Sequence, residues 1–545
     1  MKLIKPNILS PTDGSFSRAS IATYIDSDRH LKVAPINTPR FHYFNDGFKG
    51  ILLEEASTNY IEQSEIIPEG PGTDVVSNSY LAPDNTTSAD ALIETVGYNG
   101  DHISYPTYVY FNSPTKYVYS VFIKKLNGST RRIGISAHGQ YSMHSAIFDF
   151  SLGIVSVDMS GTIKGAGYEE LSDSWYRVWV YGEVTSTPNP LNFDIRLFKV
   201  DNFYYVGEAG QGVIAWGQQL EYGLSSAYPS ITAFTKPTSY IKTTGAPATR
   251  AADVITGSGF IYSDVINADA NYSAGTTYAI GNRVTYSGKT FESLQNSNIN
   301  HDPLVSPTWW LLIGPDNRHA AFDNSVSTVT QGNEILTLVV KPGSIDSVGL
   351  IDMEGIVMEF AVTDITDGLL FTKTVGLSGV EVNNWHDYFF LSPLSDMKRT
   401  QYIFNDLPSQ YTDPIVTIRI KNGVNVAKLG LASFGKMSSI GEVEYGAGAG
   451  IVDYSVKSTD EFGNTSLVQR NFSKKLSARC FVPNKDINRV QRTLYSIRAT
   501  PVVWVGVDDP TYEEAMIVWG FYKDFTTEIS YPTYSLVSIE IEGLS

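Results

Sequence analysis

The sequence predicts a mostly β, multidomain protein with jelly-roll or concanavalin-like sandwiches and one small α+β domain. Turn formers and aromatics are abundant, with 45 glycines, 25 prolines, 33 tyrosines and 26 phenylalanines. Short β-branched and aromatic runs, such as YVYSVFI at 117–123 and WYRVWV at 175–180, alternate with Gly, Asn, Asp and Ser turns. This pattern is typical of antiparallel β-sandwiches. Trp175 and Trp179 share one strand face, so we expect them in a core.

One segment near the C-terminus has a helical period instead. Over residues 485–498 the apolar side chains recur every three or four positions, at Ile487, Val490, Leu494 and Ile497. Asn484 is the expected N-cap of this helix. Strands are expected around it at 476–482, 502–507, 515–525 and 535–542. The last hundred residues therefore form the α+β domain.

Shifts in composition suggest the other boundaries, with residues 226–250, rich in Pro, Thr and Gly, expected as a linker. The expected segments are an extended N-terminal segment at 1–65, a lectin-like jelly-roll sandwich at 66–250, a small module at 258–314, a β-sandwich at 315–445 and the α+β domain at 446–545.

The charge balance excludes some classes of partner. There are 40 Lys+Arg and 57 Asp+Glu, so the net charge is −17. A chain this acidic is a poor match for nucleic acid or an anionic membrane surface. No apolar run approaches the ~20 residues that span a bilayer. Cys480 is the only cysteine and cannot form an internal disulfide or a Cys-rich zinc site. Pro6 interrupts the N-terminus before an apolar signal-peptide core, so we expect synthesis in a reducing cytosol.

The search for catalytic motifs finds no enzyme signature. The eight histidines show no HExxH spacing, and no G-x-S-x-G elbow is present. GAGAG at 446–450 precedes a strand-like run and is interpreted as a flexible turn. We therefore expect no catalytic residues, no metal and no cofactor. Glycoside hydrolysis needs only two facing carboxylates, so an enzyme remains a lesser alternative.

An aromatic cluster between residues 272 and 310 is the most informative motif. Two short strands there meet at Ser287-Gly288, a hairpin signal. A module this small needs its aromatic rings as a core, but one or two could stay exposed and stack on sugar rings. The run TTYAIGNRVTYSGKTFESLQNSN…P…WW resembles the small carbohydrate-binding modules of the chitin-binding type. That resemblance implies glycan contacts at the matching positions, which are Tyr278, Tyr286, Trp309 and Trp310.

Two longer stretches resemble proteins of tailed bacteriophages. INTPRFHYFNDGFKGILLEEASTNYIEQSE at 36–65, the two strand motifs and WGQQLEYG…PTSYIKTTGAPATRAADV at 216–254 resemble tail and spike proteins with a jelly-roll domain. A virion-structural family is similar to the rest, at GPDNRHAAFDN (314–324), WHDYFF (385–390), 451–483, 499–507 and 520–544. Shorter members of that family imply that residues from about 10 to 250 are a lectin-like insertion.

These resemblances imply a structural, host-adsorption component of a phage tail tip, fibre or spike. The implied partners are other tail proteins and a host surface glycan, either lipopolysaccharide or capsule. We also expect a homo-oligomer, a trimer or higher, located in the virion and assembled in the host cytoplasm. The alternatives are a purely structural tail or collar protein without sugar binding and, less favoured, a polysaccharide depolymerase.

Overall fold

The computed structural model describes the whole chain except residues 8, 10–12, 45–46, 140–144, 160, 186–188, 225–233, 324, 378–398, 460–464, 508–511 and 545. The expected motif at 385–390 lies outside the described residues. The chain forms two compact units. Unit 1 comprises Met1–Ser15 and Thr256–Ser545, and unit 2 comprises Phe16–Ile255. Unit 2 spans nearly the same residues as the insertion expected at about 10 to 250, and the boundary expected at residue 65 falls inside it. That these residues are a lectin-like insertion stays a prediction.

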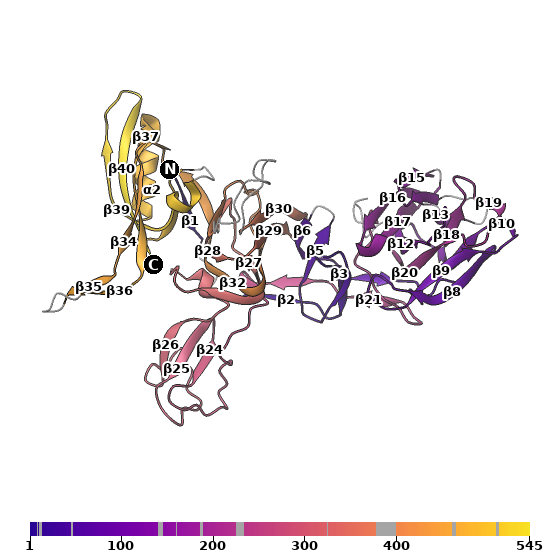
Figure 1. Ribbon diagram of the computed structural model, residues 1–545, viewed down its shortest axis with the longest axis horizontal. Coiled ribbons are helices and arrows are strands. Elements are labelled where there is room, and N and C mark those ends of the chain that lie inside the picture. Colours follow the sequence, from indigo (N-terminus) through magenta and orange to yellow (C-terminus); the bar gives the residue numbers. More distant parts are fainter. Residues whose placement is uncertain are drawn as a thin grey trace. The chain divides into compact units, whose positions relative to one another are not determined.

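Unit 2 is a β-sandwich of two antiparallel sheets (Figure 1). The five-stranded sheet runs, in spatial order, β11 (Ile103–Phe111), β18 (Asn189–Phe198), β13 (Arg132–His138), β14 (Ser145–Asp149) and β15 (Gly153–Val157). The six-stranded sheet runs β16 (Ile163–Glu170), β17 (Trp175–Val184), β12 (Thr115–Lys125), β20 (Gly212–Leu224), β9 (Ala89–Glu94) and β8 (Thr73–Tyr80). The predicted strands at 117–123 and 175–180 are confirmed as parts of β12 and β17.

Both faces of the six-stranded sheet are covered, so β12 is buried along most of its length. One face meets the five-stranded sheet through rings such as Tyr117, Tyr119 and Phe193. Phe122 and Trp216 lie on the opposite face in a second, smaller core, which also holds Trp175. Trp175 and Trp179 are 2% and 8% exposed, so their predicted place in the core is confirmed.

Two parts of the chain close the second core. They belong to the segment 1–65, which the sequence predicted to be extended, and to the segment 226–250, which it predicted to be a linker. Segment 16–65 folds into short paired strands: β3 (Ala22–Ile25) with β4 (Leu31–Ala34), β5 (Arg40–Phe44) with β6 (Gly47–Leu52), and β7 (Ser57–Asn59) with β21 (Ala248–Arg250). Tyr240 and Ile241 are 3% and 7% exposed, so this part of the expected linker is interior. The polar composition of this part suggested an exposed linker, but its residues form hydrogen bonds with other parts of the unit.

Unit 2 also contains smaller elements. These are β10 (Asn99–Asp101) paired with β19 (Tyr204–Val206), η1 (Ser172–Ser174), and the pair β2 (Ser15–Ser17) and β22 (Val254–Thr256) at the boundary of the unit.

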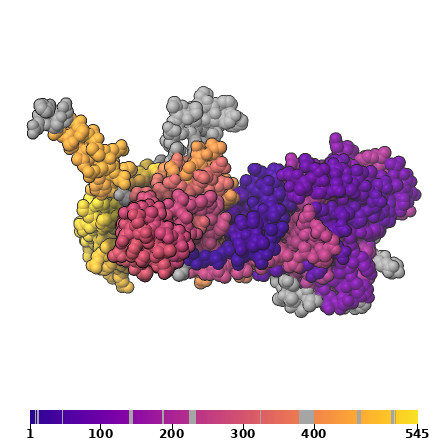
Figure 2. Space-filling view, turned by 90° about the horizontal axis from the view of Figure 1, so that it is seen from below, coloured from indigo at the N-terminus to yellow at the C-terminus, as the bar shows by residue number. Residues whose placement is uncertain are grey.

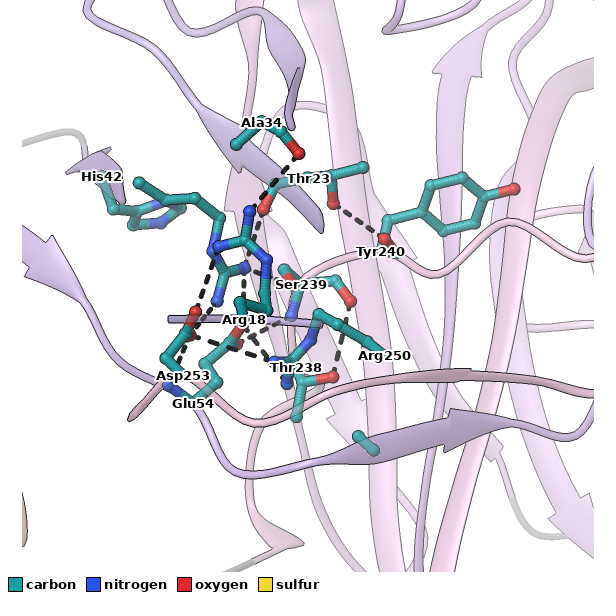
Figure 3. A network of polar contacts seen from close by, with 12 residues as sticks. Arg18, Thr23, Ala34, His42, Glu54, Thr238, Ser239, Tyr240, Arg250 and Asp253 are labelled. Atoms are coloured by element: carbon teal, nitrogen blue, oxygen red, sulfur yellow. Dashed lines mark hydrogen bonds and ion pairs between the residues drawn. The ribbon is translucent and has the colours of Figure 1, made fainter. Parts of the chain in front are cut away.

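A buried network of three arginines and two carboxylates ties the ends of unit 2 together. Arg18 Nη1 donates to Asp253 Oδ1 at 3.1 Å, and Arg40 Nη1 donates to Glu54 Oε2 at 2.8 Å. Arg40 Nη2 also donates to Asp253 Oδ2. Figure 3 shows Arg18 and Arg250 turned toward Asp253 and Glu54. Burial alone would raise the pKa of Glu54, but Arg250 and Arg40 bring it down to about 2.

Unit 1 is built on a 14-stranded antiparallel sheet. Its main path is β23 (Gly259–Ser263), β27 (Thr330–Lys341), β32 (Ile415–Ser439), β1 (Lys2–Pro6), β38 (Val502–Val505), β39 (Ile517–Glu528), β40 (Tyr534–Gly543), β37 (Phe472–Pro483) and β33 (Glu442–Val443). The side strands are β28 (Ser347–Glu354), β29 (Val357–Asp364), β30 (Gly368–Gly376), β31 (Gln401–Phe404) and β34 (Gly448–Asp453). Both domains expected at 315–445 and 446–545 contribute strands to this one sheet.

The C-terminal part of unit 1 has the predicted α+β arrangement. Helix α2 (Ile487–Ser496) buries Val490 and Leu494 against the sheet, as the helical period predicts (Figure 1). Asn484 is not its N-cap, because a 3₁₀ turn, η4 (Asn484–Asp486), precedes the helix. The Asn484 amide instead donates to the carbonyls of Tyr531 and Pro532, which anchors the loop before β40. The remaining short elements are η3 (Ala320–Phe322) and α3 (Glu513–Met516).

The first strand of the chain lies in the middle of this sheet. β1 pairs with the end of β32 on one side and with β38 on the other. Leu3 and Ile4 are both fully buried, on the two faces of the sheet. Beyond β34, a two-stranded arm of β35 (Val456–Thr459) and β36 (Thr465–Val468) leaves the sheet (orange in Figure 2). No helix in the described parts of the chain is long and apolar enough to cross a membrane.

Candidate functional site

The small aromatic module of unit 1 is a three-stranded antiparallel sheet. It comprises β24 (Arg283–Tyr286), β25 (Lys289–Ser293) and β26 (Trp310–Pro315). Ser287 and Gly288 have φ angles of 51° and 73°, as the tight turn of a two-residue hairpin requires. The predicted hairpin is confirmed, whereas residues 259–263, expected in the module, form β23 of the large sheet.

Two of the four aromatic residues predicted to contact glycan are core residues. Tyr278 and Trp310 are 8% and 2% exposed, with ring centroids 5.2 Å apart. Their polar tips are engaged as well. Trp310 Nε1 donates to the His301 carbonyl at 2.9 Å, and the Ser273 amide donates to the Tyr278 hydroxyl at 2.8 Å. These two rings hold the module together and offer little surface to a ligand.

The other two predicted residues, Tyr286 and Trp309, are half-buried at the edge of this core. Trp309 stacks on the His301 ring, with centroids 3.8 Å apart and 13° between the planes. The Tyr286 hydroxyl donates to Asp302 Oδ2 at 3.4 Å. Contact with a sugar therefore remains a prediction for Tyr286 and Trp309.

A second aromatic site, which the sequence did not indicate, lies in unit 2. It is an open groove of about 700 Å³ that is partly lined by the edge strand β11. Four tyrosines and three prolines account for much of its lining, and Glu62, Gln63 and Thr107 add polar groups. The tyrosines are Tyr60, Tyr108, Tyr110 and Tyr222. We call this site the tyrosine groove.

Tyr108 and Tyr110 form one side of the tyrosine groove, and both belong to the edge strand β11. Alternate side chains of a strand point to opposite faces. Val109 and Phe111 accordingly pack into the sandwich core, while Tyr108 and Tyr110 are 60% and 51% exposed. The pairing of β11 with β18 shifts register next to Pro106, a residue that an edge strand tolerates.

Tyr60 and Tyr222 form a rigid stacked pair in the same groove. Their ring centroids are 3.8 Å apart, with 18° between the planes. Phe111 meets Tyr222 edge-on at 5.2 Å, which fixes that ring from the core side. Burial raises the pKa of Tyr222, and Tyr60 adds to the shift, so the phenol of Tyr222 is neutral at pH 7.

Asn59 holds Tyr60 in place from within the core. Its side chain is fully buried and makes four hydrogen bonds. Nδ2 donates to the carbonyls of Gln218 and Ile241, while Oδ1 accepts the amides of Ile61 and Leu220. All four distances lie between 2.8 and 3.1 Å. The core thus fixes the backbone that carries Tyr60, and a side of the groove that is already ordered lowers the entropy cost of binding.

Flat ring faces with a few polar groups at their edges suit one ligand chemistry in particular. The C–H faces of pyranose rings stack on aromatic rings, and sugar hydroxyls bond to amide, carboxylate and hydroxyl groups. No local pattern in the sequence marks this groove. Tyr60 and Tyr222 lie in the blocks NYIEQ and LEYG, which are far apart in the chain from each other and from Tyr108.

Two other polar clusters in unit 2 are accounted for by internal contacts. In the buried arginine network, Asp253 Oδ2 also accepts the Glu54 amide, and Glu54 Oε1 accepts the Ser239 amide. All four carboxylate oxygens are therefore engaged within the unit, which makes the network structural. Asp26, Asp28 and His30 bring possible metal-ligand atoms within 4.8 Å of one another. Asp26 already accepts the amides of Asp28 and His30, which is an ordinary turn.

Comparisons with known proteins add little to this geometry. No protein-family model matches the chain, and no curated protein matches it either. Among solved structures, the N-terminal CBM22-1–CBM22-2 tandem domain of Paenibacillus barcinonensis Xyn10C is 8% identical, with a TM-score of 0.17 over 70% of this chain and 98% of that chain. The coconut allergen cocosin is also 8% identical, with a TM-score of 0.10 over 72% and 89%. Likenesses this slight carry no argument.

Proposed function

We propose that this protein binds a glycan through unit 2 and serves as a host-adsorption component of a phage tail. The observation that carries the proposal is the tyrosine groove, with Tyr108 and Tyr110 exposed beside the stacked pair of Tyr60 and Tyr222. Exposed aromatic side chains gathered in one groove are uncommon on a surface that has no ligand. The resemblance of several sequence blocks to tail and spike proteins supports the virion location.

In this proposal the two units have different roles. Unit 2 recognises the host surface glycan, and the module of unit 1 adds a weaker contact through Trp309 and Tyr286. The large sheet of unit 1 docks to other tail proteins. Several copies on one particle, as a homo-oligomer, would convert weak single contacts into avid attachment. We propose no catalytic activity, cofactor or metal.

A glycan-binding assay on the full chain tests the proposal directly. We expect the wild-type protein to bind one group of surface polysaccharides, and Tyr108→Ala to weaken that binding at least tenfold while leaving the fold intact. Tyr108→Phe should retain most of the binding, because the ring is kept. The matched control is Tyr204→Ala, since Tyr204 is 58% exposed in the same unit but does not line the groove.

The alternatives give different results in the same assays. A purely structural tail or collar protein would bind no glycan although it is folded. A depolymerase would release oligosaccharides from the polysaccharide that it binds. Gold labelling of intact particles with an antibody against residues 66–250 tests the location. Label at the tail tip or fibres is expected, and absence of the protein from particles would overturn the virion assignment.

A further inference from the structure

We infer that the tyrosine groove takes an uncharged glycan and discriminates against glycans that carry carboxylate or sulfate groups. The inference rests on the proposed function, because it names the class of ligand for the same groove. It depends on the charges that the groove presents, whereas the proposed function depends on its ring faces.

The tyrosine groove contains almost no charge. Among the described residues that line it, Glu62 is the one acidic side chain, and none is Lys, Arg or His. Glu62 is exposed and has no ion pair among the described residues. Lys242 does not line the groove, and its ammonium group is 2.7 Å from Glu65 Oε2. An anionic ligand in the groove would therefore meet a carboxylate and no cation.

This arrangement of charges weakens the binding of acidic sugars. A uronate or sulfate that approaches the ring faces loses part of its hydration, and the protein returns no charge-assisted hydrogen bond for it. The carboxylate of Glu62 adds repulsion, which is strongest at low salt. A neutral pyranose has no such cost, since it needs only ring stacking and hydrogen bonds.

The polar groups of the tyrosine groove match neutral hydroxyl and amide groups. Gln63 can donate and accept through its amide, Thr107 through its hydroxyl, and Glu62 can accept from sugar hydroxyls. The neutral phenol of Tyr222 adds no charge to this set. A neutral hexose or N-acetylhexosamine unit can therefore stack its ring face on a tyrosine and form hydrogen bonds through its hydroxyl and amide groups. Neither interaction needs an ion pair.

The test compares three sets of oligosaccharides on the full chain. The neutral set is β-1,4-glucan, β-1,4-linked N-acetylglucosamine and α-mannan, the acidic set is hyaluronan, polygalacturonate and polysialate, and the cationic set is β-1,4-linked glucosamine. We expect the neutral set to bind and the acidic set not to bind, with an affinity for the neutral set that changes less than twofold between 50 and 500 mM salt. Any binding of the cationic set should weaken with salt, because the carboxylate of Glu62 attracts it. Tyr108→Ala should weaken binding of the neutral set at least tenfold.

Charge reversal at Glu62 gives the sharper readout. Glu62→Lys should raise affinity for the acidic set at least tenfold, and Glu62→Gln should raise it less. Glu69→Lys is the matched control, because Glu69 is also exposed and close in sequence but does not line the groove. It should leave the preference unchanged.

Each outcome separates the inference from the proposed function. Tyr108-dependent binding of acidic oligosaccharides, as tight as that of neutral ones, overturns the inference and leaves glycan binding in place. An equal gain in Glu62→Lys and Glu69→Lys also overturns it, because the effect would then come from overall charge. Absence of binding to every set, and to the polysaccharides of adsorbing hosts, overturns the proposed function and the inference with it.

Discussion

Tyr60 lies flat on Tyr222, and the amide of Tyr60 donates a hydrogen bond to the carbonyl of Leu220, two residues before its stacking partner. The two tyrosines are far apart in the sequence, yet the Asn59 side chain accepts the amides of Ile61, next to Tyr60, and of Leu220 in β20, the strand that holds Tyr222. The same buried amide that closes the sandwich therefore also builds one wall of the tyrosine groove. Stability and binding are coupled at this point.

Asn59→Asp tests that coupling. The new carboxylate would face the carbonyls of Gln218 and Ile241 without a donor, so we expect unit 2 to lose about 3 kcal/mol or more of stability at pH 7. Glycan binding should fall with it. Burial raises the pKa of such a carboxyl, so the deficit should shrink as the pH falls and a protonated oxygen again supplies a donor.

Urea unfolding monitored by tryptophan fluorescence at several pH values measures this effect. Asn202→Asp is the control, since Asn202 is exposed and uses its side chain only to accept the amide of Tyr204. A deficit that is equal in both variants, or independent of pH, would show that Asn59 has no special role.

Asp253→Asn should destabilise unit 2 by about 3–5 kcal/mol, because it leaves Arg18 and Arg40 buried with too little negative charge. Asp201→Asn is the matched control. Asp201 also pairs with an arginine, Arg132, but its side chain is 75% exposed, and such pairs contribute about 0–1 kcal/mol. Thermal unfolding of both variants decides the matter, and similar losses would contradict a structural role for the network.

Trp309 and Trp310 are adjacent in sequence and should behave differently. Trp310→Ala removes a core ring, so we expect the module to lose about 3–5 kcal/mol and to unfold, which NMR detects as a loss of its dispersed signals. Trp309→Ala should leave the module folded and reduce any binding of chitin oligosaccharides to it. If Trp309→Ala binds chitin oligosaccharides as well as the wild type does, the module does not contact glycan through Trp309.

His319 should make the stability of unit 1 depend on pH. Burial alone would lower its pKa, but hydrogen bonds with Asp13 and Asp316, at 3.2 and 2.6 Å, raise it to about 9. The pKa of an unfolded histidine is about 6.5. The stabilisation is therefore fully present below about pH 6.5 and is lost as the pH rises through about 9, an effect of at most about 3 kcal/mol.

Unfolding of the wild-type protein between pH 6 and pH 10 tests this linkage. His319→Gln should lower stability at pH 6 and remove most of the slope between pH 6.5 and pH 9. An unchanged slope in that variant would mean that other groups cause it. An NMR titration of the imidazole gives the pKa independently.

The sequence predicted local elements better than it predicted sites. The alternation of apolar and polar residues predicted strand β17, and the 3.6-residue apolar period predicted helix α2. Trp175 and Trp179 were predicted in the core because they lie on the same face of one strand. Asn484 was misassigned because a cap and a loop anchor look alike in sequence. The tyrosine groove could not be predicted, since Tyr60, Tyr108 and Tyr222 are far apart in the sequence and meet only because the two sheets of the sandwich pack together.

The place of β1 has a consequence for the order in which the chain acquires structure during synthesis. The partners of β1 are residues 435–439 and 503–505, which leave the ribosome long after residues 2–6. Unit 2, whose two sandwich sheets lie between residues 73 and 224, can complete its core while those partners do not yet exist. The first strand must therefore stay without its partners while unit 2 folds, and a chain stopped before residue 435 would contain a folded unit 2 and an incomplete unit 1.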